Sequence, residues 1–282
     1  MSEKVVADER EYLRPDKRFP SLWCPGCGIG IIESAIIRAV ASLGLDRNQV
    51  AMVSGIGCSG RMPIYVDFYG LHTTHGRALA FATGLKMAQP KLKIIVVMGD
   101  GDAVAIGGNH FLHAARRNID LTVIVVNNQT YGLTSGQYSP TTPRGARTTT
   151  SRYGNIENPL DISALAAAVG ASFVARSTVY HALEMEKFVR QALQKKGFAL
   201  VECISNCHVH FGRLNQMPTA VEMLNWQKDN TISIQEVQRR HGGQVPQGKI
   251  TRGVLVDREL PEYVEEYQKL LARAQQAARV GP

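Results

Sequence analysis

The sequence predicts an α/β protein in which helices cover a mainly parallel sheet. Short apolar runs, such as IIVVMG at 94–99 and TVIVV at 122–126, alternate with segments whose apolar residues recur at helical spacing. Gly, Asn, Asp or Pro marks the junctions between them. Strands that alternate with helices in this way pair in parallel, because each helix carries the chain back across the sheet.

The expected elements follow one another without an internal repeat. Periodicity predicts helices at 28–44, 76–89, 107–118, 160–169 and 179–196, and strands at 50–54, 93–98, 121–127 and 198–205. The stretch 134–159 is polar and has no clear period. From about residue 212 the chain has polar, Gly-containing linkers and ends in a charged amphipathic helix at 261–280. We therefore expect a main domain over 1–211 and a C-terminal extension over 212–282.

The composition is that of a globular protein with a sizeable core, since 44% of the 282 residues are hydrophobic and 20% are charged. No apolar run approaches the roughly 20 residues that cross a bilayer. The charged start, MSEKVVADEREYLRPDKR, does not resemble a signal peptide, so we expect a cytoplasmic protein without membrane contact. The net charge of +8 favours an acidic partner only weakly, because the basic residues are scattered.

Five cysteines without an export signal indicate reduced thiols that bind a metal or a cluster. Cys24 and Cys27 are three residues apart, Cys58 follows a predicted strand, and Cys203 and Cys207 flank the end of the strand at 198–205. Parallel strands would bring such cysteines to one edge, where four thiolates could hold an iron–sulfur cluster. Zinc could take the same ligands. A thioredoxin-like redox pair is a weaker alternative, because no strand precedes Cys24, and Cys203 could simply be a buried small residue.

The segment MGDGDAVAIGGNHFLHAARRNIDLTVIVVNNQTYG at 98–132 carries the most chemistry. One strand ends at Gly99-Asp100-Gly101 and the next at Asn127-Asn128, at the sheet edge where open α/β folds bind ligands. Asp100, Asn128 and the backbone carbonyl of Thr130 supply the oxygen ligands that Mg²⁺ prefers, and the glycines let backbone approach phosphate. Two plain turns would explain the same residues. A nicotinamide site is disfavoured, because no G-x-G-x-x-G opens a helix.

The spacing of 28 positions from Asp100 to Asn128 resembles the diphosphate-binding motif of thiamine-diphosphate enzymes. Together with WCPGCG, GIGCSGR, HTTHGRALAFATGLKMA and NNQTYGLTSGQ, residues 20–215 resemble the β subunit of 2-oxoacid:ferredoxin oxidoreductases. The resemblance implies the thiamine-diphosphate-binding fold, with thiamine diphosphate, Mg²⁺ and a [4Fe-4S] cluster held by Cys24, Cys27, Cys58 and a late cysteine. Ser205-Asn206-Cys207 matches the family's Ser-Pro-Cys turn better than Cys203 does, so Cys207 is the expected fourth ligand.

The resemblance also implies further site residues. Expected cofactor contacts, besides the metal ligands, are Gly57, His75, Gly99, Gly101, Asp102, Leu133 and Thr134. His75 directly precedes a predicted helix and is an expected catalytic residue, whereas His72 or His75 could equally be structural. Arg61 could pair its planar fork with a substrate carboxylate, which mildly favours 2-oxoglutarate, or it could be a surface arginine.

The function that the resemblance implies is oxidative decarboxylation of a 2-oxoacid to acyl-coenzyme A and CO2, with electrons passed to ferredoxin through the cluster, in either direction. The chain has no second motif for the aminopyrimidine, so we expect an α subunit to supply it in an (αβ)2 assembly. One alternative is a non-redox thiamine-diphosphate decarboxylase or synthase with structural zinc. The other, a zinc-containing nucleic-acid module, leaves GDGD and NNQTYG unexplained, and nucleic acid is not an expected partner.

Overall fold

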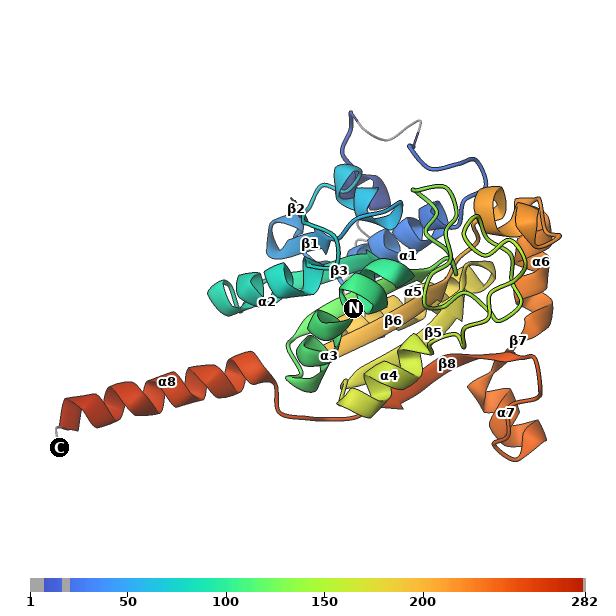
Figure 1. The fold of residues 1–282 in the computed structure, drawn as a ribbon. Helices are drawn as coiled ribbons and strands as arrows, with labels where there is room; N and C mark the ends of the chain where they lie inside the picture. The colour runs from blue at the N-terminus through green and yellow to red at the C-terminus, as the bar shows by residue number, and fades with distance from the viewer. Residues whose placement is uncertain (1–7, 17–20, 281–282) are drawn as a thin grey trace, which may run out of the picture.

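The centre of the molecule is one sheet that runs through its whole width (Figure 1). The computed structural model describes residues 8–16 and 21–280. Within these residues the strand order is β2-β1-β3-β4-β6-β5-β8-β7. Across the sheet these strands are β2 (Tyr69–His72), β1 (Val50–Ser54), β3 (Lys93–Gly99), β4 (Leu121–Asn127), β6 (Phe198–Ile204), β5 (Phe173–Thr178), β8 (Ile250–Asp257) and β7 (Thr231–Ser233). The strands from β2 to β5 are parallel, which confirms the predicted α/β class.

Helices pack on both faces of the sheet and form two hydrophobic cores. One face carries α1 (Ile29–Ser42) and α5 (Ala182–Gln194), and the other carries α2 (Ala78–Ala88), α3 (Gly108–Arg116) and α4 (Ile162–Val169). Successive strand residues point to opposite faces. In β1, for example, Met52 packs under α1 while Val53 packs under α2. Burial on both faces explains why the central strands are continuous apolar runs.

The described elements agree with the predicted helices and strands before residue 212, apart from shifts of one to three residues at their ends. Two strands were not predicted. The edge strand β2 is exposed at all four positions and contains a glycine, so it has no alternating apolar pattern. Strand β5 is fully buried but contains Arg176, whose charge is paired inside the protein, and the sequence FVARST therefore does not read as a core strand.

The segment after residue 212 contains more structure than the single predicted helix. It holds α6 (Ala220–Asn230), α7 (Ile234–His241), β7, β8 and α8 (Tyr263–Val280). The predicted C-terminal helix is confirmed as α8, which points away from the sheet (Figure 1). Strand β8 pairs antiparallel with β5, so part of this segment belongs to the sheet. The domain boundary at 212 stays a prediction.

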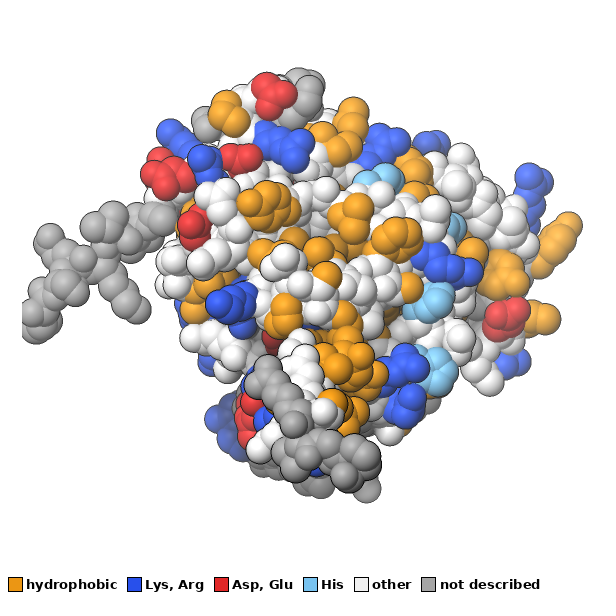
Figure 2. Space-filling model, turned by 90° about the vertical axis from the view of Figure 1, so that its left-hand side faces the viewer, with side chains coloured by type: hydrophobic (Ala, Val, Ile, Leu, Met, Phe, Trp, Pro, Cys, Tyr) orange, Lys and Arg blue, Asp and Glu red, His pale blue; other side chains and the backbone are white. Residues whose placement is uncertain are grey.

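Hydrophobic side chains gather on the face that contains β2 and α2 (Figure 2). Tyr69 and Leu71 of β2 and Phe81 of α2 are among the exposed large apolar residues. Each of these three side chains exposes more than a third of its surface. In the described part of the chain, no helix has the length and apolar character needed to span a bilayer.

Candidate active site

The loops that follow β1, β3 and β4 meet at the carboxyl edge of the sheet and enclose a small pocket of about 90 Å³. We call it the Asp100 pocket. It brings together the predicted residues Gly57, Cys58, His75, Gly99, Asp100, Gly101, Asp102, Asn128, Thr130, Leu133 and Thr134. Its remaining lining residues, Ile56, Ser59, Tyr131 and Gly132, were not predicted.

Asp100 is a buried carboxylate at the end of β3, with 2% of its surface exposed. One of its oxygens, Oδ2, accepts hydrogen bonds from Ser139 Oγ at 2.5 Å and from Thr141 Oγ1 at 2.6 Å. Burial raises the pKa of Asp100, and these hydroxyl donors oppose that shift. A carboxylate in this position is stabilised if a cation shares the pocket.

The two asparagines after β4 have different surroundings. Asn127 is held from both sides, because its Nδ2 donates to Glu202 Oε1 at 2.8 Å and its Oδ1 accepts from the Gln129 backbone at 3.1 Å. Asn128 Oδ1 is buried without a hydrogen-bond partner among the described residues. An unpaired buried oxygen costs free energy. Asn128 and Asp100 therefore offer the oxygen donors that a hard cation such as Mg²⁺ binds, and the residues present fit that ion.

Gly101 is required by a close contact with Tyr131. A Cβ at position 101 would lie 2.2 Å from two carbons of the Tyr131 ring. The chain then continues in a π-helical turn, Asp102–Ile106, before α3 begins. Turns of this kind are rare in proteins overall, but those that occur are often found at functional sites. Only glycine therefore lets the backbone after β3 pass this close to Tyr131, which lines the pocket.

Asp102 organises the other side of the pocket. Its Oδ1 accepts a short hydrogen bond from His75 Nδ1 and a 2.7 Å bond from the Gly76 backbone N–H. Because a carboxylate only accepts, Nδ1 of His75 carries the proton, and Nε2 is available on the opposite side of the ring. The second oxygen, Asp102 Oδ2, is buried and has no partner in the described chain. The hydrogen bond between His75 and Asp102 fixes the orientation of the His75 ring in the Asp100 pocket.

Four cysteines line a second pocket of about 170 Å³, the cysteine pocket. They are Cys24 and Cys27, which precede α1, Cys58 after β1, and Cys207 after β6. A Cβ on Gly132 would lie 3.5 Å from Cys207 Sγ and 3.7 Å from Cys58 Sγ, so both sulfurs face this glycine. Cys203 is instead fully buried in the core formed with α1 and α5. Cys203 is therefore not part of the pocket that the other four cysteines line.

The four sulfurs influence one another electrostatically. Burial first of all, and also the charges of Cys207, Cys58 and Cys24, raise the pKa of the Cys27 thiol to about 12, although the Ile29 backbone N–H opposes the shift. Burial also raises the pKa of Cys207, against hydrogen bonds from the His210 and Phe211 backbone. Crowded thiolates of this kind need a positive group between them. Backbone N–H groups already point at two of the sulfurs, as in sites that hold iron–sulfur clusters.

The donor spacing bears on the zinc alternative. Over residues 8–16 and 21–280, no group of three or more His, Cys, Asp or Glu side chains is placed to hold one metal ion. A tetrahedral zinc site needs four donors around a single centre. Within these described ranges the four cysteines share a pocket but do not form a four-donor centre for a single ion.

The two pockets share a wall. Cys58, Asn128, Gly132 and Leu133 line both of them. Gly132 has no side chain to separate the sulfurs of Cys58 and Cys207 from the Asp100 pocket. A single layer of residues therefore separates the two pockets.

Some predicted residues lie outside both pockets. Arg61 is in the 3-10 helix Ser59–Ile64 and lines neither pocket, although its charge lowers the pKa of Cys58, which burial, Cys207 and Cys24 raise. His72 is exposed, and its Nδ1 lies 3.0 Å from Ser54 Oγ. Ser139 and Thr141, which bind Asp100, come from the polar stretch 134–159, where no periodicity marked them.

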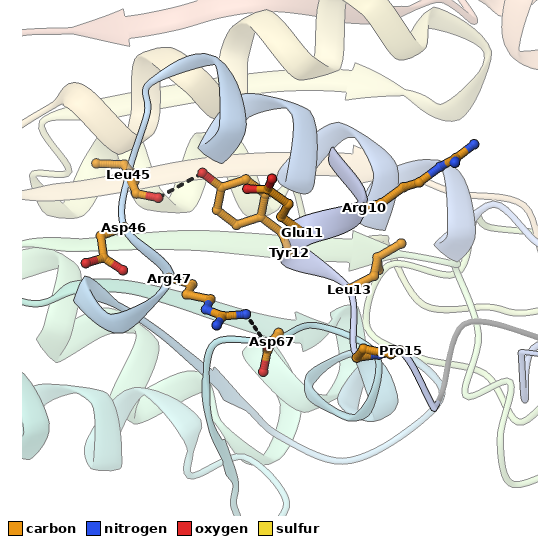
Figure 3. A pocket seen from close by; sticks show the side chains of 9 residues that line it. All are labelled: Arg10, Glu11, Tyr12, Leu13, Pro15, Leu45, Asp46, Arg47 and Asp67. Atoms are coloured by element: carbon orange, nitrogen blue, oxygen red, sulfur yellow. Dashed lines mark hydrogen bonds and ion pairs between the residues drawn. The ribbon is translucent and has the colours of Figure 1, made fainter. Parts of the chain in front are cut away.

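A larger hollow of about 470 Å³ lies elsewhere, near the N-terminal end of the described chain (Figure 3). Its charges are mixed, and Arg47 forms an ion pair with Asp67 at 2.6 Å. The Tyr12 hydroxyl donates to the Leu45 carbonyl at 3.0 Å. None of the predicted site residues lines this hollow.

Comparison with known proteins gives matches over most of the chain. Residues 55–203 match the family model described as "Thiamine pyrophosphate enzyme, C-terminal TPP binding domain". The chain is 48% identical over 252 residues to 2-oxoglutarate synthase subunit KorB of Methanothermobacter marburgensis, covering 89% of this chain and 88% of the relative. It is 51% identical to the KorB subunit of Archaeoglobus fulgidus, with 83% and 87% covered.

The chain belongs to the 2-oxoglutarate synthase β-subunit family. A solved structure, the 2-oxoglutarate:ferredoxin oxidoreductase of Magnetococcus marinus with 2-oxoglutarate, coenzyme A and succinyl-CoA bound, is similar over 95% of this chain and 90% of that chain. The TM-score is 0.83 and the identity is 34%. The predicted family, the thiamine-diphosphate-binding fold and the enzyme class are confirmed. As in other members of this family, the chain is one subunit of a multisubunit 2-oxoacid:ferredoxin oxidoreductase.

Proposed function

We propose that this chain is the thiamine-diphosphate- and cluster-binding subunit that oxidatively decarboxylates 2-oxoglutarate, forms acyl-coenzyme A and CO2, and passes the electrons to ferredoxin. The single observation that supports it most is the wall of Cys58, Asn128, Gly132 and Leu133 shared by the two pockets. A non-redox decarboxylase would have no use for a redox centre one layer away from its cofactor. The same chemistry can run as reductive carboxylation.

In this proposal the Asp100 pocket holds the diphosphate through Mg²⁺. Asp100, Asn128 and the Thr130 carbonyl are the protein ligands of the ion. Gly57, Gly99, Gly101 and Asp102 surround the diphosphate, with Leu133 and Thr134 towards the thiazolium ring. The unpaired oxygen of Asn128 supports this assignment, because a bound cation would satisfy it. Thiamine diphosphate, when bound, supplies an electron sink for the negative charge that decarboxylation leaves behind.

The proposed cluster is a [4Fe-4S] centre with Cys24, Cys27, Cys58 and Cys207 as ligands. The common pocket of these four cysteines supports the choice of Cys207 over Cys203. The backbone N–H groups directed at Cys27 and Cys207 stabilise thiolates, and such hydrogen bonds also raise the potential of a cluster.

The names of the relatives support 2-oxoglutarate as substrate, and the Magnetococcus marinus enzyme was solved with 2-oxoglutarate and coenzyme A. Arg61 is the proposed partner of a substrate carboxylate. His75, oriented by Asp102, is the proposed catalytic residue that presents Nε2 to the reacting region. Both side chains are partly exposed, so the substrate can approach them from outside the pocket.

We infer that an α subunit supplies the aminopyrimidine half of the site in an (αβ)2 assembly. The pocket is small, Leu133 in its lining is exposed, and apolar residues of β2 and α2 crowd the surface shown in Figure 2. A second protein that covers this region would exclude water from the reaction.

The test is anaerobic co-purification of both subunits, followed by metal analysis and an assay against 2-oxoglutarate, pyruvate and a branched-chain 2-oxoacid. We expect about four irons per β chain, a visible absorbance band, and coenzyme-A-dependent reduction of an acceptor with 2-oxoglutarate. Zinc in place of iron, together with decarboxylation that needs no acceptor, would instead establish the non-redox alternative. Full turnover by the isolated chain would refute the need for the α subunit.

A further inference from the structure

The cysteine pocket reaches the surface at one side. Cys24 is exposed, whereas Cys27, Cys58 and Cys207 are half-buried. Leu22, which also lines the pocket, has 60% of its surface exposed. Electron transfer to another protein is fastest through the thinnest cover, so the surface next to Cys24 is where a redox centre in this pocket would be reached.

Besides Cys58, the residues that line this pocket come from three segments, and none of these segments contains an acidic residue. They are 21–32, 128–156 and 203–221, although the whole chain has 24 Asp and Glu residues. They do contain basic residues, namely Arg144, Arg147, Arg152 and Arg213, with His208 and His210 on the pocket wall. The exposed arginines of these segments outnumber the exposed acidic residues that directly flank the segments, Glu157 and Glu222.

Contacts between the segments bring two of the arginines beside the pocket. Asn215 Oδ1 accepts from the Arg147 backbone at 2.9 Å, and Asn215 Nδ2 donates to the Phe211 carbonyl at 2.8 Å. A Cβ on Gly136 would lie 2.9 Å from the Cβ of His210. The loop of Arg147 thus packs against the turn that contains Arg213, which leads into α6 (Figure 1).

Both guanidinium groups are available for a partner. Arg147 and Arg213 are exposed, and neither side chain forms a hydrogen bond or ion pair with a described residue. Exposed Leu214 (42%) and Val221 (65%) lie in the same segment as Arg213. An apolar centre with a charged rim is the usual composition of a transient protein interface.

From these observations we propose that this basic surface, defined by Leu22, Arg147, His210, Arg213 and Leu214, is the docking site for a small acidic one-electron carrier protein of the ferredoxin class. The inference rests on the proposed function, since it needs a cluster in the cysteine pocket. In the encounter complex the reduced cluster loses one electron and the oxidised carrier gains it, and no proton or group moves. Opposite charges hold the two proteins together only briefly, which suits repeated turnover.

The experiment compares two electron acceptors with the same co-purified enzyme, 2-oxoglutarate and coenzyme A. One acceptor is an acidic bacterial ferredoxin, and the other is methyl viologen, a small cation that needs no docking surface. The variants are Arg147→Glu, Arg213→Glu and their combination, with milder Arg147→Gln and Arg213→Gln as a check on folding. Arg239→Glu on α7, whose residues line neither pocket, changes the net charge by the same amount as each single Arg→Glu variant.

We expect the double variant to raise the KM for ferredoxin by roughly 10-fold or more at low salt, and the difference to shrink as salt screens the charges. The rate with methyl viologen and the iron content should stay those of the wild type, and Arg239→Glu should change neither acceptor. Unaltered ferredoxin kinetics in the double variant would overturn the docking site. A parallel loss with methyl viologen would overturn it as well, because the arginines would then act on the active site. If the wild type reduced neither acceptor, the proposed function itself would fail.

Discussion

Asn206 ties the two cysteine-bearing loops to each other, since its Nδ2 donates a hydrogen bond to the Gly26 carbonyl at 3.0 Å. Gly26 lies between Cys24 and Cys27, and Asn206 directly precedes Cys207. The Asn206 side chain is fully buried. One hydrogen bond thus fixes the distance between loops 180 residues apart that carry three of the four proposed cluster ligands. The related family turn has proline here, which cannot make this bond.

Replacing Asn206 with alanine should loosen the cluster and leave the cofactor pocket intact. We expect the variant to lose iron to a chelator several-fold faster than the wild type, because a buried hydrogen bond of this kind contributes about 1 kcal/mol and its loss frees the loop. Visible absorbance after timed chelator exposure measures this. Asn230→Ala is the matched control, because Asn230 Nδ2 also donates to a backbone carbonyl, that of Trp226, at 2.9 Å, but outside the site. Equal iron loss in both variants would count against the role of Asn206.

Substitution by alanine should have different effects at Cys207 and at Cys203. Cys207→Ala removes a residue of the cysteine pocket and should abolish most of the visible cluster absorbance. Cys203→Ala removes one buried sulfur from the core and should lower the free energy of unfolding by about 1 kcal/mol while the cluster remains. Iron analysis and chemical unfolding separate the two results. A cluster lost from Cys203→Ala and kept in Cys207→Ala would reverse the assignment.

Gly101 and Gly108 offer a matched pair for the cofactor pocket. In Gly101→Ala the new methyl would meet the Tyr131 ring at 2.2 Å, so the loop with Asp100 must shift. We expect binding of thiamine diphosphate with Mg²⁺ to weaken by roughly 10-fold or more, as buried polar contacts of about 1–3 kcal/mol are misaligned. Gly108 has open space at the same point and lies at the start of α3, so Gly108→Ala should bind normally and gain up to about 1 kcal/mol of stability. Calorimetric titration and thermal unfolding of both variants provide the measurement.

The sequence predicted the elements that long apolar runs define, because a central strand such as β4 must be apolar on both faces. It also predicted Asp100 and Asn128, since residues that end parallel strands meet at one edge whatever else the chain does. It could not predict β5, where the buried charge of Arg176 is compensated by two carboxylates, Glu202, whose Oε2 lies 2.8 Å away, and Asp161. Neither partner belongs to β5, so local periodicity does not reveal them.

Some site residues were not predicted for the same reason, because their contacts are with residues distant in the sequence. Ser139 and Thr141 belong to a stretch without period, and only the fold shows that their hydroxyls converge on Asp100. The shared wall of the two pockets likewise depends on Gly132 lying against Cys58 and Cys207, which come from different loops. Four cysteines share one pocket because Cys58 follows β1, Cys207 follows β6, and Cys24 and Cys27 precede α1. The choice between Cys203 and Cys207 needed the family turn, and the structure separates the two by burial.

Glu33 gives the apo chain a pH dependence that can be measured. Its carboxyl lies on α1, where burial raises its pKa to about 8, and its Oε1 has no hydrogen-bond partner among the described residues. Between the ordinary carboxyl pKa and this value the folded chain keeps a proton that the unfolded chain releases. The stability contributed by the neutral acid is therefore present at low pH and is lost as the pH rises towards 8.

Glu33→Gln replaces the acid by a neutral amide of nearly the same shape. Residue 33 should therefore not lower the free energy of unfolding of this variant as the pH rises over this range. We expect the variant and the wild type to unfold alike near pH 5 and the variant to be more stable near pH 9, by on the order of 3 kcal/mol. Urea unfolding at the two pH values measures the difference. Glu157→Gln, at an exposed position, controls for the loss of one charge. The contrary result is a difference in the free energy of unfolding between wild type and Glu33→Gln that does not change with pH. It would mean that Glu33 is ionised in the folded chain and that water or a partner group reaches its carboxylate.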